Sequence, residues 1–232
     1  MNKHQEQHLR NSDFITDTVI GLSDGLTVPF ALAAGLSGAV ASNGIILTAG
    51  IAEIVAGSIA MGLGGYLAGK TEIEHYDSEL KREYDEVEAV PEKEKEEIRE
   101  IFAGYGLSVD SQKQIVEELA KDKDQWVDFM MKFELGLERP SLNRARNSAL
   151  TIGGAYVVGG FVPLLGYFFT DLPMQGLMVS SVLTIICLFV FGYFKSRATG
   201  QPPIQGAFKV LIVGVIAAAA AFLVARFLNS AV

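Results

Sequence analysis

Two carboxylates stand alone inside apolar stretches of the sequence. Asp24 and Glu53 are the only acidic residues well inside segments that are otherwise long and nearly uncharged. A charged side chain at the centre of a bilayer costs about 2.5 to 3.5 kcal/mol on insertion scales, so such residues are typical of a path for cations or protons. The alternative is that each carboxylate bonds to a hydroxyl group of a neighbouring helix.

Met61 is matched to Asp24 by its depth. At 1.5 Å per residue, Asp24 lies roughly 12 Å from the start of its span and Met61 roughly 12 Å from the end of the next, so an antiparallel hairpin brings them level. Glu53 lies nearer the opposite face. Pro29 cannot donate to the carbonyl of Gly25, which leaves an oxygen beside Asp24 for a cation. We therefore expect these carboxylates and Met61 to line a transport pathway.

A second group of carboxylates lies in a polar segment. Spacings of three, four and seven residues place them on shared helix faces. Carboxylates bind hard divalent ions, and methionine sulfur shifts the preference toward first-row transition metals. An acidic face balanced by neighbouring lysines and arginines is the alternative. The expected metal ligands are Glu72, Glu79, Glu83, Glu86, Glu94, Glu97, Met130, Met131 and Glu134.

We expect no enzyme activity and no prosthetic group. Glu72 and His75 form one Glu-x-x-His pair, but a di-iron bundle needs a second pair, and the other two histidines lie near the N-terminus. The zinc-protease motif His-Glu-x-x-His is absent. Cys187 is the only cysteine, which excludes a disulfide framework and a Cys-ligated metal cluster.

Five apolar helices must position the first group of residues. The chain has 232 residues, and its apolar stretches cover about 16 to 40, 44 to 69, 148 to 170, 173 to 195 and 206 to 228. Each is long enough to cross a bilayer of roughly 30 Å, which excludes a purely soluble fold. Pairs such as Gly21 with Gly25 and Gly65 with Gly69 allow helices to approach closely, within one chain or across a dimer.

The polar segment between the second and third spans is acidic and helical. From Lys70 to Arg146 it holds 13 Lys and Arg and 21 Asp and Glu, so its net charge of −8 equals that of the whole chain. This acidity argues against nucleic-acid binding. Trp126 and Tyr105 are expected to pack the segment. The second span is expected to continue to Ala89, and further helices to run from Pro91 to about Gly104 and from Asp124 to Leu137. Between them, a helix capped by Ser108 or Asp110 is expected to run to about Lys121.

The basic residues near the spans predict the orientation. Lys and Arg occur in the N-terminal tail, the acidic segment and the fourth connection, so these parts are expected to face the cytosol. We therefore expect an all-α, polytopic membrane protein with five transmembrane helices and a three-helix cytosolic metal-binding domain inserted between helices two and three. The expected boundaries are 1–15 for the cytosolic N-terminal tail, 16–69 for transmembrane helices 1 and 2, 70–146 for the acidic domain and 147–232 for transmembrane helices 3 to 5.

The sequence resembles the vacuolar iron transporter family over essentially its whole length. The resemblance lies in TDTVIGLSDGLTVPF from Thr16, EIVAGSIAM from Glu53 and the acidic segment after YLAGKTEIEHY. Members of that family are homodimeric five-span carriers that exchange cytosolic ferrous iron for protons from an acidic vacuole. Asp24, Glu53 and Met61 match the family's pathway positions. The positions that match its cytosolic metal-binding domain are Glu83, Glu86, Glu94, Glu97, Met130, Met131 and Glu134.

The resemblance implies a secondary transporter in the vacuolar membrane. Its transported ion would be Fe²⁺, with protons as the exchanged ion, lipid as its surroundings and a second copy of the chain as its partner. Zn²⁺, Mn²⁺ or Co²⁺ would be able to occupy the cytosolic sites. Two alternatives stay open: a passive channel for divalent metals, and a dimeric membrane anchor whose acidic helices bind a protein partner.

Overall fold

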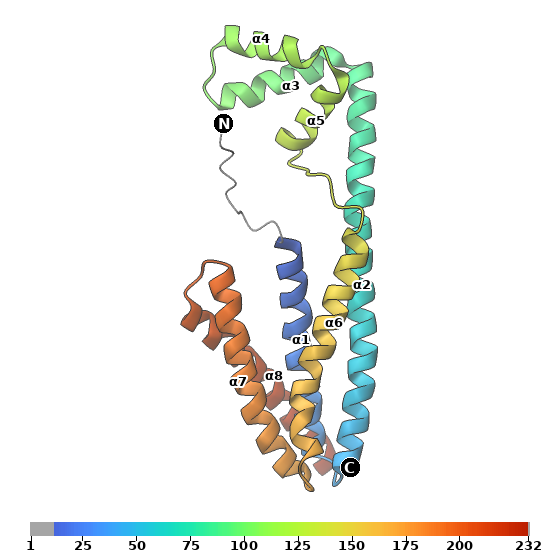
Figure 1. The fold of residues 1–232 in the computed structure, drawn as a ribbon, viewed down its shortest axis with the longest axis vertical. Helices are drawn as coiled ribbons and strands as arrows, with labels where there is room; N and C mark the ends of the chain where they lie inside the picture. The colour runs from blue at the N-terminus through green and yellow to red at the C-terminus, as the bar shows by residue number, and fades with distance from the viewer. Residues whose placement is uncertain (1–11, 232) are drawn as a thin grey trace, which may run out of the picture. The chain divides into compact units, whose positions relative to one another are not determined.

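The structure is a computed structural model that describes residues 12–231. Over that range the chain is all-helical, without a strand, which confirms the all-α part of the predicted fold class (Figure 1). Most of the predicted tail, residues 1–15, lies outside the described residues. The helices are α1 (Ser12–Ser37), α2 (Asn43–Ala89), α3 (Pro91–Gly104), α4 (Val109–Leu119), α5 (Lys123–Phe133), α6 (Arg144–Phe168), α7 (Pro173–Ala198) and α8 (Pro203–Ala231).

The chain divides into two compact units. The first consists of the described parts of Met1–Tyr66 and Arg146–Val232, and the second is Leu67–Ala145. Five helices, α1, α2, α6, α7 and α8, are long and apolar enough to cross a membrane, as the hydropathy pattern predicts. Large apolar side chains such as Ile59 and Val158 are exposed on them, which suits helices that are surrounded by lipid.

In the first unit, α6 packs closely against α1 and α2 through glycines. A Cβ atom on Gly21 would overlap the carbonyl oxygen of Ile152, and one on Gly25 would overlap that of Tyr156. On α2, a Cβ atom on Gly57 would lie 2.6 Å from Cζ of Tyr156. Any side chain at these positions would push the helices apart. The small-residue spacing in the sequence therefore serves packing within one chain.

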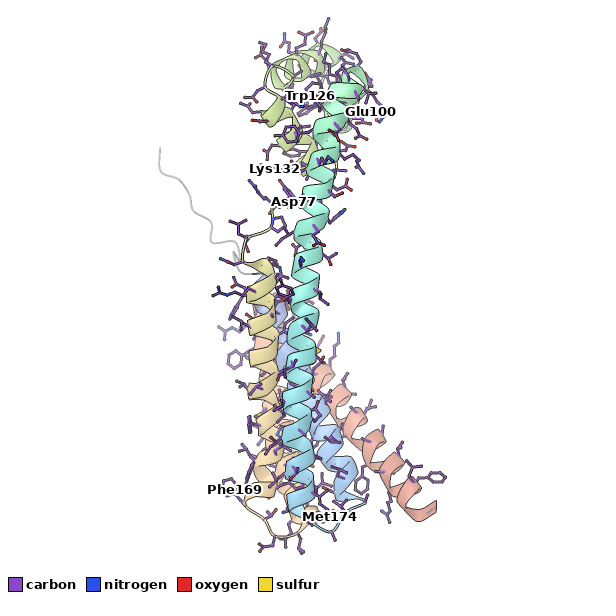
Figure 2. The ribbon with its side chains drawn as sticks, turned by 90° about the vertical axis from the view of Figure 1, so that its right-hand side faces the viewer. Asp77, Glu100, Trp126, Lys132, Phe169 and Met174 are labelled. Carbon is purple, nitrogen blue, oxygen red and sulfur yellow. The ribbon has the colours of Figure 1, made fainter. Side chains whose placement is uncertain are left out.

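The last two helices form a hairpin that packs against α1. A Cβ atom on Gly192 of α7 would lie 2.8 Å from Cα of Ala207 of α8, so the two backbones nearly touch there. The rings of Phe189 and Phe208 meet edge to face, with their centroids 5.5 Å apart. Phe169 and Met174 lie at the connection from α6 into this hairpin (Figure 2).

Local signals explain where the helices of the second unit begin and end. No Gly or Pro interrupts α2 between Lys70 and Ala89, and Val90 leaves the helical conformation before Pro91, which opens α3. The Ser108 side chain accepts a hydrogen bond from the N–H of Ser111 and thereby caps α4. These three boundaries confirm the sequence prediction.

The end of α5 differs from the expectation. The helix ends at Phe133, not at Leu137. Gly136 adopts a φ of +65°, and the N–H of Leu137 donates to the carbonyl of Met131 at 2.7 Å. A glycine in the left-handed region ends helices in this way because it turns the chain back over the last carbonyls.

The core of the second unit is built by α2, α3, α4 and α5. Ile98, Val116 and Met130 are fully buried there, and Trp126 packs among them as expected (Figure 2). The expectation for Tyr105 is wrong, because its side chain is 74% exposed. It follows directly after α3, where the chain turns toward Gly106 with a φ of +78°, so its ring lies outside the core.

Candidate functional site

The Glu53 carboxylate lies in a polar site within the first unit. Its Oε1 accepts a hydrogen bond from the hydroxyl of Tyr156, which comes from α6. Its Oε2 is buried and has no hydrogen-bond partner within residues 12–231. One oxygen of Glu53 is thus bonded to a hydroxyl group of a neighbouring helix, which is the alternative to a transport role that the sequence left open. The other oxygen has no such bond. A buried carboxylate oxygen without a donor is costly unless it binds a proton or a cation.

Tyr156 also connects this site to the neighbourhood of Asp24. Its backbone lies directly against Gly25, the residue that follows Asp24 on α1, while its ring packs on Gly57 of α2. Asp24 is half-buried, and so is Met61, about two turns beyond Glu53 along α2. Tyr156 therefore makes contact with both helices that carry the predicted pathway residues.

Sequence reasoning missed Tyr156. It lies in an apolar, glycine-rich helix 103 residues away from Glu53, and local spacing gives no sign of the pairing. The available signal was its hydroxyl, because a tyrosine inside a transmembrane helix needs a hydrogen-bond partner.

The second unit brings three of the predicted metal ligands together. Glu83 from α2, Glu94 from α3 and Glu134 at the end of α5 each place an oxygen within 4.8 Å of the others. Glu83 and Glu94 are each only 1% exposed, whereas Glu134 is exposed. Oε2 of Glu83 and both carboxylate oxygens of Glu94 have no hydrogen-bond partner among the described residues. Three converging carboxylates fit a hard or borderline divalent cation.

Burial and mutual repulsion shift the titration of this cluster. Burial raises the pKa of Glu83 from 4.5 to about 7, and the charges of Glu134 and Glu86 add to the shift. The pKa of Glu94 is also raised, first by burial and then by Glu97 and Glu83. Burial, Glu97 and Glu86 raise the pKa of Glu134. Near neutral pH, protons therefore compete with cations for these oxygens.

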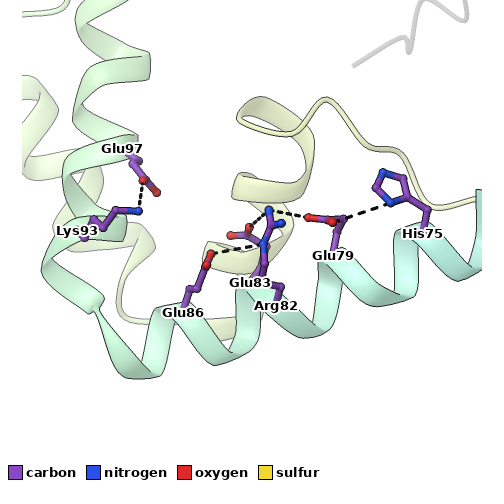
Figure 3. Close-up of polar contacts among 7 residues, drawn as sticks. All are labelled: His75, Glu79, Arg82, Glu83, Glu86, Lys93 and Glu97. Atoms are coloured by element: carbon purple, nitrogen blue, oxygen red, sulfur yellow. Dashed lines mark hydrogen bonds and ion pairs between the residues drawn. The ribbon is translucent and has the colours of Figure 1, made fainter.

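The other predicted glutamate ligands are paired with basic side chains. Arg82 lies 2.6 Å from Glu79 and 3.8 Å from both Glu83 and Glu86, and His75 approaches Glu79 at 3.9 Å (Figure 3). The structure pairs Lys93 with Glu97 at 2.8 Å and Arg144 with Glu72 at 3.2 Å. These glutamates are exposed or partly exposed, and basic side chains balance their charges. This is the alternative to metal binding that the sequence left open.

Met130 and Met131 are fully buried in the core of the second unit. Packing of apolar side chains around them accounts for this placement. Their predicted role as sulfur ligands stays a prediction. Glu134, the predicted ligand four residues after Met130, caps the end of the same helix.

Two short sequences match motifs of other protein classes but lie in the wrong context. Residues 64–71, GGYLAGKT, fit the pattern of a phosphate-binding loop, and residues 21–25, GLSDG, fit that of a nucleophile elbow. The first lies wholly inside α2 and the second wholly inside α1. Helical backbone amides are already hydrogen-bonded within the helix, so neither segment can form the loop or the strained turn that these motifs require.

Comparison with known proteins gives matches over nearly the whole chain. A model of the VIT family matches residues 15–226. The chain is 52% identical over 226 residues to vacuolar iron transporter 1 of Arabidopsis thaliana, covering 97% of this chain and 90% of that protein. It is 52% identical over 230 residues to vacuolar iron transporter 1 of Tulipa gesneriana, covering 99% and 93%. It is 39% identical over 221 residues to Protein CCC1 of Saccharomyces cerevisiae, covering 90% and 68%. The chain therefore belongs to the VIT family.

Proposed function

We propose that this protein is a secondary transporter that moves ferrous iron from the cytosol into the vacuole in exchange for protons, as a homodimer. The similar proteins of Arabidopsis thaliana and Tulipa gesneriana are named vacuolar iron transporters. The single observation that carries the proposal is the Glu53 carboxylate, which is held by Tyr156 through one oxygen and lacks a donor for the other among residues 12–231. A group of this kind inside an apolar span supports exchange of a proton for a cation.

In the proposed path, the glutamates of the second unit collect the ion and Asp24 and Met61 receive it. Glu53 then exchanges a proton for the metal, because a buried carboxylate oxygen without a hydrogen-bond partner among residues 12–231 can bind either cation. Zn²⁺, Mn²⁺ and Co²⁺ share the preference for oxygen ligands and are candidates for the same sites.

Uptake by proteoliposomes tests the proposal. Purified protein is reconstituted, a pH gradient is imposed with an acidic lumen, and Fe²⁺ uptake is followed. Glu53→Gln and Asp24→Asn keep the side-chain size but remove the charge, and we expect either change to abolish gradient-driven uptake. Asp171→Asn, in the connection between α6 and α7, is the matched control and should transport normally.

The outcomes separate the proposed function from its alternatives. Uptake that ignores the pH gradient would show a passive channel. Normal exchange by both Glu53→Gln and Asp24→Asn would remove these carboxylates from the path. Absence of metal flux in the unmodified protein, together with capture of a basic protein by the acidic unit, would favour the membrane anchor.

A further inference from the structure

A cavity of about 210 Å³ lies where α7 ends and α8 begins. Lys195, Ser196 and Thr199 line it from the end of α7, and Gln205 and Lys209 line it from the first turns of α8. Its volume is below the range of about 300 to 1,000 Å³ that is usual for sites of drug-sized ligands. The cavity therefore suits a small polar group held by two ammonium groups.

The charged residues that line this cavity are Lys195 and Lys209, and no carboxylate is among the lining residues. From residue 172 to the C-terminus the sequence contains four basic residues, Lys195, Arg197, Lys209 and Arg226, and no Asp or Glu. Neither Lys195 nor Lys209 forms a salt bridge within the described part of the chain. Two lysines that face one cavity without a carboxylate attract an anion.

Ser196 places a hydroxyl group at the wall of the cavity. Its side chain is only 6% exposed and lies on the wall of the cavity, yet its hydroxyl makes no hydrogen bond with any residue between 12 and 231. The Oγ atom is packed against Gly206, where a Cβ atom would overlap it. A hydroxyl at the wall of a polar cavity, without a partner among the described residues, can donate to an anion bound there.

The start of α8 adds further donors. The N–H of Gly206 is bonded to the carbonyl of Pro202, whereas the preceding N–H groups of this 29-residue helix have no earlier turn to bond to. A helix N-terminus of this kind favours an anion through its amides and its dipole. Both lysines and the Ser196 hydroxyl line the same cavity.

Apolar side chains that are next in sequence to residues lining the cavity indicate the source of the anion. Phe194, Ile204 and Phe208 are 59%, 61% and 51% exposed, and they flank Lys195 and Lys209 in the sequence. In a chain whose long helices are surrounded by lipid, such residues contact acyl chains. A molecule with both a phosphate and acyl chains matches this combination, whereas a soluble phosphate would leave the apolar surface unused.

We propose that this cavity binds the phosphate of an anionic phospholipid headgroup. Lys195 and Lys209 supply the charge, and Ser196 and the first turn of α8 supply neutral donors. Basic pockets between transmembrane helices bind anionic headgroups in this manner, and lysine suits a phosphate as a compact point charge. The acyl chains of the lipid lie along the exposed apolar side chains of α7 and α8.

Binding by the purified full-length protein in neutral detergent tests the proposal. The probes are dioctanoyl phosphatidylglycerol, dioctanoyl phosphatidylcholine with the same tails, and glycerol 3-phosphate without tails, and native mass spectrometry counts what stays bound. We expect one tightly held phosphatidylglycerol per chain and no comparable retention of the other two. Lys195→Gln with Lys209→Gln should weaken phosphatidylglycerol binding by at least about tenfold. Lys113→Gln with Lys121→Gln, at exposed positions in α4 and just after it, should leave it unchanged.

Two results would overturn the proposal. Equal phosphatidylglycerol affinity in the Lys195→Gln, Lys209→Gln variant would show that the cavity does not hold the headgroup. Equal affinity for glycerol 3-phosphate would show a site for a soluble anion and not for a lipid. If the double variant does not fold, Ser196→Ala decides, because it removes only a hydroxyl. We expect it to weaken binding by roughly three- to tenfold, and an unchanged affinity would contradict the proposal.

Discussion

Glu83 and Glu86 lie one turn apart on α2, and their surroundings give the same side chain different chemistry. Arg82 approaches Glu83 and Glu86 alike at 3.8 Å, but the Glu86 side chain is 40% exposed, so water also stabilises its charge. The Glu83 side chain is 1% exposed and faces Glu94 and Glu134. An exposed pair of this kind contributes little to stability, whereas a buried carboxylate needs a proton or a cation.

The affinity of the Glu83, Glu94 and Glu134 cluster for divalent metal should fall as the pH falls below about 7. The pKa of Glu83 is raised to about 7, so below that value a proton must leave before the metal binds. The apparent affinity then drops by about tenfold per pH unit for each proton displaced, and it levels off above pH 7. Calorimetric titration of the purified protein with Mn²⁺ between pH 5.5 and 8 measures this.

Matched variants identify the binding groups in that titration. Glu83→Gln with Glu94→Gln should remove the pH-dependent binding. Glu117→Gln with Glu118→Gln changes the charge equally at exposed positions of α4 and should preserve it. An affinity that is constant between pH 5.5 and 7 would contradict the assignment.

Two substitutions of Met130 separate packing from metal binding. Met130→Ala opens a cavity in the core of the second unit and should lower the free energy of unfolding by about 2 to 5 kcal/mol. Met130→Leu keeps the volume and should cost less than about 1.5 kcal/mol, but it removes the sulfur. If Met130 is also a ligand, Met130→Leu should weaken Co²⁺ binding while the unfolding midpoint hardly changes. Unchanged Co²⁺ affinity would leave Met130 with a packing role alone.

At the scale of elements, two glycines with similar sequence surroundings have different neighbours. A Cβ atom on Gly21 would overlap the carbonyl oxygen of Ile152, whereas one on Gly154 would meet nothing within 4 Å. The first glycine sets how closely α1 and α6 approach, and the second faces open space. A list of small residues in the sequence does not distinguish them, because the distinction depends on the facing helix.

Gly21→Ala should therefore destabilise the first unit, and Gly154→Ala should not. Overpacking costs typically about 1 to 3 kcal/mol, while alanine in an open helical position gains up to about 1 kcal/mol over glycine. Thermal unfolding of both variants in the same detergent measures the difference. A lower midpoint for Gly154→Ala than for Gly21→Ala would reverse the assignment.

Over the whole molecule, features that depend on residues close together in the sequence were predictable. Contacts between residues far apart in the sequence were not. The hydropathy pattern predicted the five long helices, and Pro91 predicted the start of α3. Ser108 was a candidate cap of α4, and it is the residue that caps this helix. The hydrogen bond between Tyr156 and Glu53 joins residues 103 positions apart, so no window of sequence contains it. Spacing placed several glutamates on shared helix faces, but only the packing of α2, α3 and α5 separates the buried ones from those paired with arginine or lysine.

The buried carboxylates of the second unit also link its stability to ion binding, so a measurement of stability shows which ions it prefers. Since the folded state raises the pKa of Glu83 from 4.5 to about 7, this residue's contribution to stability is complete below about pH 4.5 and is lost as the pH rises through 7. An ion that binds only the folded protein restores stability, by about 2.7 kcal/mol at a concentration one hundred times its Kd. A melting screen at pH 7.5 with a panel of chloride salts would consequently rank Fe²⁺, Mn²⁺, Co²⁺, Zn²⁺ and Mg²⁺ before any vesicle is prepared.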